Sequence, residues 1–93
     1  MYGEVKSNSG VVFDKERYVV VKKEGDKGDT IPKHNHPEAD VLFTVVDGKV
    51  EVTLNEEEKH ELCSGKMLNF DGNNSISAVF KEKGQVFVTL IKK

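Results

Sequence analysis

Two histidines separated by a single residue are the part of this sequence best suited to chemistry. His34 and His36 flank Asn35. In an extended strand, residues i and i+2 project from the same face, so both imidazoles can point toward a common position. Neutral imidazole is a common protein ligand for iron, copper, zinc and nickel. The pair therefore predicts a site on one face of a strand, where a divalent metal can be held.

Short strands separated by turns must position this pair. Apolar stretches rich in Val, Ile, Phe and Thr predict strands over residues 17–23, 41–46, 49–54, 66–70, 76–81 and 85–91. Turn residues lie between most of them, and no window has a helical period. This spacing favours an all-β sandwich or barrel over a parallel α/β sheet.

The Asp47-Gly48 pair gives the sharpest local prediction. It supplies the positive φ angles of a two-residue type I′ turn, so residues 41–46 and 49–54 are expected to form a hairpin. Apolar and polar residues alternate in the second arm, which predicts one buried face. The first arm is apolar almost throughout, which predicts that both its faces are covered and that the domain has two layers of sheet.

The residues around the histidines resemble the first motif of the cupin family, G-x5-H-x-H-x3-4-E-x6-G. Gly28 precedes His34 by the motif's five residues, and Gly48 matches its closing glycine. The resemblance extends from Gly25 to the end of the chain. It implies an all-β fold, namely a small single-domain cupin-like β-barrel of the jelly-roll or double-stranded β-helix type. One such domain is expected over residues 1–93.

The resemblance also implies a metal held by three histidines and one carboxylate, of which only part is present here. The position of the family's glutamate holds Val41, and the adjacent Asp40 can replace it only if a bulge turns its side chain inward. In the second motif, which begins at Gly65, Asp71 replaces a proline and Ile76 replaces the third histidine.

The candidate metal ligands are therefore His34, His36 and Asp40, with Glu38 as an alternative carboxylate. Iron, manganese, nickel, copper and zinc are the metals that the resemblance implies. Two imidazoles and one carboxylate would match the non-haem Fe(II) arrangement.

Three functions stay open, so the sequence does not decide whether the protein is an enzyme. The first is a small-molecule-binding or sensor module, with a pocket between the sheets near His34, His36, Val41 and Ile76. Branched aliphatic residues at two ligand positions predict a drier pocket that binds an apolar molecule or nothing. The second is a metal-dependent enzyme of the dioxygenase or sugar isomerase type, as the resemblance implies. The third is a dimeric assembly module that uses exposed strand edges.

Composition narrows the partners and the compartment. Fourteen Lys and Arg and sixteen Asp and Glu give a net charge of -2, with both signs interspersed, which argues against nucleic acid and membrane as partners. Cys63 is the only cysteine, so no intramolecular disulfide can form. With no long apolar run, a cytoplasmic protein is expected. A chain this short buries a modest core, which favours a homodimer.

Overall fold

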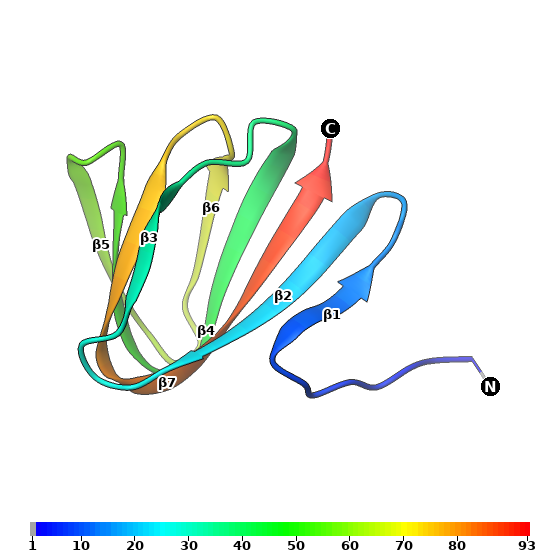
Figure 1. The fold of residues 1–93 in the computed structure, drawn as a ribbon, viewed down its shortest axis with the longest axis horizontal. Helices are drawn as coiled ribbons and strands as arrows, with labels where there is room; N and C mark the ends of the chain where they lie inside the picture. Colours follow the sequence, from blue (N-terminus) through cyan, green and yellow to red (C-terminus); the bar gives the residue numbers. More distant parts are fainter. Residues whose placement is uncertain (1) are drawn as a thin grey trace.

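The computed structural model describes residues 2–93, which form seven antiparallel strands (Figure 1). The strands are β1 (Gly10–Asp14), β2 (Tyr18–Gly25), β3 (Thr30–His34), β4 (Ala39–Leu54), β5 (Glu58–Cys63), β6 (Met67–Asp71) and β7 (Ile76–Lys92). The predicted all-β class is confirmed. Within residues 2–93 there is no helix of the length and apolar character that crossing a membrane requires.

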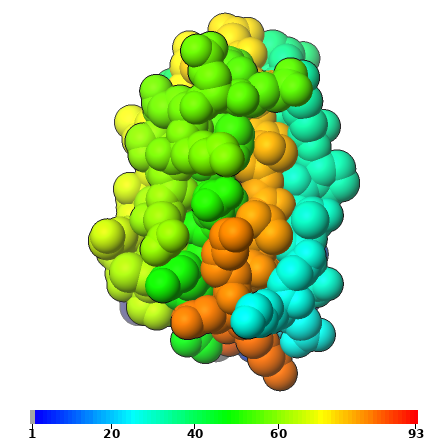
Figure 2. All heavy atoms as spheres, turned by 90° about the vertical axis from the view of Figure 1, so that its left-hand side faces the viewer, coloured from blue at the N-terminus to red at the C-terminus, as the bar shows by residue number. Residues whose placement is uncertain are grey.

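Two long strands, β4 and β7, pair along most of their length and pass through both layers of the fold. Their ends at Ala39–Val45 and Val86–Lys92 lie in a larger layer with the order β1-β2-β7-β4-β6. Their other halves lie in a smaller layer with the order β5-β4-β7-β3. Figure 2 shows the outside of this smaller layer, where the four strands lie side by side.

The predicted hairpin at Asp47-Gly48 is wrong, because β4 continues through this pair. Gly48 does have a positive φ of 86°, but it lies in a bulged bend that carries β4 from one layer to the other. Gly84 of β7 faces it, and a Cβ on Gly84 would overlap the Asp47 carbonyl oxygen. The two strands can bend together because neither has a side chain at this crossing.

The inner faces of the two layers form the hydrophobic core. Val41, Phe43 and Val45 of β4 are almost completely buried, and Phe80 of β7 packs in the same cluster. The outer face of this part of β4 is less covered than predicted. Leu42 and Thr44 are only half-buried and Val46 is 46% exposed, because no third layer of the described chain, residues 2–93, packs on the larger sheet. Met67, in the predicted strand 66–70, is 58% exposed on the edge strand β6.

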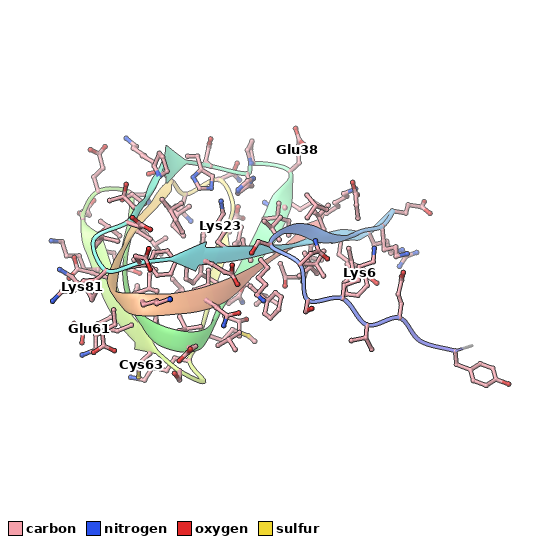
Figure 3. The ribbon with its side chains drawn as sticks, turned by 60° about the horizontal axis from the view of Figure 1, so that its bottom comes forward. Lys6, Lys23, Glu38, Glu61, Cys63 and Lys81 are labelled. Carbon is pink, nitrogen blue, oxygen red and sulfur yellow. The ribbon has the colours of Figure 1, made fainter. Side chains whose placement is uncertain are left out.

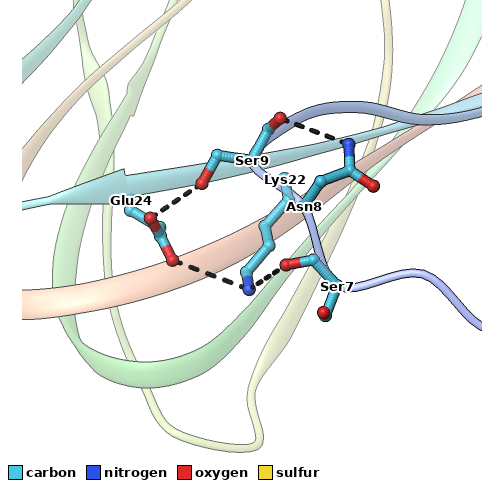
Figure 4. A network of polar contacts seen from close by, with 5 residues as sticks. All are labelled: Ser7, Asn8, Ser9, Lys22 and Glu24. Atoms are coloured by element: carbon cyan, nitrogen blue, oxygen red, sulfur yellow. Dashed lines mark hydrogen bonds and ion pairs between the residues drawn. The ribbon is translucent and has the colours of Figure 1, made fainter.

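A polar network holds the segment before β1 against β2 (Figure 4). The Ser9 hydroxyl donates to the Glu24 carboxylate at 2.7 Å, and Lys22 Nζ donates to the Ser7 carbonyl oxygen at 3.1 Å. The hydrogen bond from Ser9 lowers the pKa of Glu24. Residues 2–6 extend away from both layers (Figure 1).

Candidate functional site

A cavity of about 120 Å³ lies between the two layers at the end of the barrel where the histidines lie. Aliphatic and aromatic side chains form most of its wall, and three nitrogen-bearing side chains complete it. The lining residues are Val21, Lys23, Ile31, His34, His36, Val41, Phe43, Ile76, Val88 and Leu90. The four residues around which the sequence predicted a pocket, His34, His36, Val41 and Ile76, are all among them.

Strand pairing brings the two replaced ligand positions to the histidines. The antiparallel register of β3 and β7 places His34 opposite Ile76. Val41 is buried at 1% exposure on the inner face of β4, and residues i and i+2 of a strand share a face, so Phe43 lines the same wall. The side chains at the positions of the family's glutamate and third histidine are therefore both hydrocarbon.

His36 does not lie on the same strand as His34, as had been expected, because β3 ends at His34. Its backbone N–H instead donates to the Gly72 carbonyl oxygen at 2.8 Å, and the Gly72 N–H donates to the Ala39 carbonyl oxygen at 2.9 Å. Gly72 has no room for a Cβ, which would overlap the carbonyl oxygens of His36 and Ala39. The loop between β6 and β7 thus fixes the loop that carries His36.

The two imidazoles are nevertheless neighbours. Their ring centroids are 4.8 Å apart and their planes are nearly perpendicular, at 84°. His34 Nδ1 lies 2.7 Å from the Pro32 carbonyl oxygen, which can only accept, so Nδ1 carries a hydrogen. In the neutral ring Nε2 is then the free acceptor. The pKa of His36 is lowered, first by burial and then by its neighbours His34 and Lys23.

Lys23 is a residue of the site that sequence reasoning missed. It lies opposite Val86 in the β2–β7 register and lines the cavity, and Figure 3 shows its side chain within the outline of the barrel. Lys81 and Glu61, by contrast, extend outward in the same view. The signal was that Lys23 follows Val19 and Val21 at two-residue spacing and so shares their face of a predicted strand.

The carboxylates predicted as metal ligands lie away from the imidazoles. Asp40 is exposed and lies opposite the exposed Asp71 and Ile91 in adjacent strands, while its neighbour Val41 faces the cavity. Glu38 is also exposed and projects from the rim (Figure 3). Within residues 2–93, no three His, Cys, Asp or Glu side chains come close enough to hold a metal together. The donors of this cavity therefore do not fit the family's four-ligand metal site.

The third histidine and the cysteine lie outside the cavity. His60 Nε2 is 2.6 Å from the Glu58 carboxylate on the partly exposed surface of β5. Cys63 is exposed at the end of the same strand (Figure 3). Neither residue contributes to the candidate site.

Two antiparallel layers that share strands and enclose a small cavity beside two histidines place this chain among the small β-barrel proteins. The family model that matches this chain is the cupin domain, over residues 24–89. The chain therefore belongs to the cupin family, and the predicted jelly-roll fold is confirmed.

Solved structures show the same fold. KdgF from Halomonas sp. is 25% identical with a TM-score of 0.80, covering 89% of this chain and 76% of that one. A cupin superfamily protein from Desulfitobacterium hafniense has a TM-score of 0.82 at 11% identity, covering 96% and 84%. A conserved protein of unknown function from Streptococcus pyogenes has a TM-score of 0.80 at 19% identity, covering 89% and 71%. A comparison with curated proteins gave no match.

Proposed function

We propose that this cupin binds a small organic molecule in the cavity between its layers, as a binding or sensor module. The observation that carries the proposal is the replacement of two metal-ligand positions by Val41 and Ile76, both of which line the cavity. A site that retains two imidazoles beside a hydrocarbon wall can orient a ligand with a few polar groups while burying its apolar part.

The cavity limits the ligand to a small size. A dry cavity of about 150 Å³ accommodates benzene, and this one is about 120 Å³. Pentanamide is a suitable neutral probe, because its short alkyl chain matches the apolar wall and its amide can exchange hydrogen bonds with the imidazoles.

Calorimetric titration with pentanamide tests the proposal when it is combined with a variant that fills the cavity. Ile76→Phe places a ring where Ile76 now borders the cavity, so pentanamide binding should weaken by at least about tenfold. The matched control is Val79→Phe, since Val79 lies on β7 but does not line the cavity. Equal binding by wild type and Ile76→Phe would overturn the proposal.

Metal analysis provides a second test, because the metal site of His34, His36 and Asp40 stays a prediction. The protein should be purified without chelator or affinity resin. Near-stoichiometric iron, manganese, nickel, copper or zinc that is lost in His34→Ala would contradict a binding module and favour the metal-dependent enzyme.

We also propose that two copies of the chain associate through the outer face of the larger layer. Four strands of this layer expose large apolar side chains, and extended apolar surface of this kind often marks an interface. The residues are Tyr18, Val46, Met67 and Ile91, which are 41%, 46%, 58% and 41% exposed. A second copy would cover a surface that no third layer covers within residues 2–93.

A further inference from the structure

We infer that the ligand carries a carboxylate group that is bound by the Lys23 ammonium. This inference rests on the proposed binding function and specifies the chemical class of its ligand. Lys23 is the one lysine or arginine of the cavity lining, and no acidic side chain lines this cavity.

The position of Lys23 makes it available to a ligand. Its side chain is half-buried on the inner face of β2, opposite the fully buried Val86. No carboxylate of residues 2–93 lies within ion-pair distance of its ammonium, and no hydrogen bond engages it there. The Asp29 carboxylate on the nearby turn has a different partner, because it accepts a hydrogen bond from the Asp26 backbone N–H at 2.8 Å.

Lys22 provides the contrast on the same strand. Its side chain lies on the opposite face of β2, where Nζ is 3.6 Å from Glu24 and donates to the Ser7 carbonyl oxygen. Lys22 thus has its polar partners within the chain. Lys23, the next residue, faces a mostly apolar cavity that contains no acidic partner for it. An ammonium that is partly removed from water gains most from a partner of opposite charge.

The imidazoles beside Lys23 suit the same ligand. Lys23, His34 and His36 all line this cavity. A neutral His36 retains one N–H that can donate to a carboxylate oxygen. Phe43, Val88 and Leu90 line the rest of the wall and can bury a short alkyl chain. These features point to an aliphatic monocarboxylic acid of about four to six carbon atoms.

The experiment compares three probes of nearly equal shape: pentanoate, pentanamide and pentylammonium. Calorimetric titration of the wild-type protein near neutral pH should give pentanoate an affinity about tenfold above that of pentanamide, with pentylammonium the weakest. In Lys23→Met, pentanoate should lose its preference over pentanamide, so the ratio of the two affinities falls to about one. Lys23→Arg should restore the preference for the acid, because it keeps the charge.

Lys22→Met is the matched control, since it removes the same charge one residue away on the other face of β2. It should keep the preference for pentanoate. Equal affinities for pentanoate and pentanamide in the wild type would overturn the carboxylate inference and leave the binding function standing. Failure of both probes to bind would overturn the two together.

Discussion

Val41 and Ile76 determine what the two imidazoles face. Both side chains are hydrocarbon and both line the cavity, at 1% and 3% exposure. A metal at this place would lack two of its four ligands, and a buried cation without enough donors is unfavourable. The polar chemistry of the site is therefore limited to two imidazoles and the ammonium of Lys23.

Restoring the two ligands should create a metal site. The double variant Val41→Glu, Ile76→His supplies a carboxylate and a third imidazole at positions that already face His34 and His36. We expect it to bind about one Ni²⁺ or Mn²⁺ per chain after dialysis, measured by elemental analysis. The control Leu42→Glu, Val79→His places the same groups on β4 and β7 away from the cavity. Metal binding equal to that of the wild type would contradict the assigned positions.

His36 should make the stability of the fold depend on pH. Its pKa is lowered in the folded state, mainly by burial, so the unfolded chain takes up a proton at a higher pH than the folded chain does. The free energy of unfolding should therefore fall as the pH drops from about 7 through the histidine range to about 5.

Urea denaturation of the wild type and of His36→Gln measures this effect. The variant should lose less stability over the same pH interval, because it has no group to protonate at this position. His60→Gln is the control, since His60 lies on the partly exposed surface of β5 beside Glu58. Parallel pH profiles for wild type and His36→Gln would argue against a buried, neutral His36.

At the scale of elements, the bend shared by β4 and β7 gives the two layers their common strands. Gly48 and Gly84 lie at this crossing, where a Cβ on Gly48 would come within 2.5 Å of the Lys83 carbonyl oxygen. Backbone atoms cannot yield as a flexible side chain does. The absence of side chains at these two positions is thus a condition for the fold.

Gly84→Ala should destabilise the protein by about 3 kcal/mol, since the new methyl group overlaps the backbone of Asp47. Gly65→Ala separates this effect from backbone strain, because Gly65 has a φ of 87° but open space around its Cβ position. Gly65→Ala, which introduces only this backbone strain, should lower the free energy of unfolding by about 1 kcal/mol. The two values come from denaturant midpoints and slopes. Equal losses in both variants would mean that the close approach at the bend is absent.

The sequence predicted most of the apolar strands, but it missed β1 and predicted the links between strands less well. An Asp-Gly pair provides the same positive φ for a type I′ turn and for a bulge, so Asp47-Gly48 alone could not distinguish a hairpin from a bend. The deciding partner, Gly84, lies far along the chain. The strands β3 and β5 contain few apolar residues, so neither was among the strands predicted from apolar stretches.

The two motifs located residues that line the cavity, but they did not locate the lining residue that strand pairing brings there. The spacing of the first motif located His34 and His36, and counting along both motifs located Val41 and Ile76. Lys23 belongs to no motif, and it reaches the cavity only because β2 pairs with β7. The spacing of residues within one segment does not predict which distant strand that segment will pair with.

At the scale of the whole molecule, the larger layer leaves an apolar outer face uncovered. If a second copy covers it, Ile91→Glu should place a charge in the interface and shift the protein to monomer. Light scattering at high micromolar concentration measures the mass directly. Val5→Glu is the control, because Val5 is 98% exposed on the segment that extends away from the layers. A monomeric wild type, or a dimer that only Val5→Glu dissociates, would contradict this interface.

The binding of a small molecule between the layers is tested most directly by methyl NMR during a titration with neutral pentanamide. We predict that the methyl signals of Val41, Ile76, Val88 and Leu90 shift together and saturate with one dissociation constant. Those of Leu42 and Val79, which lie on β4 and β7 but do not line the cavity, should stay in place. Unchanged cavity methyl signals up to the solubility limit of the probe, or shifts confined to the outer positions, would contradict a ligand site inside this barrel.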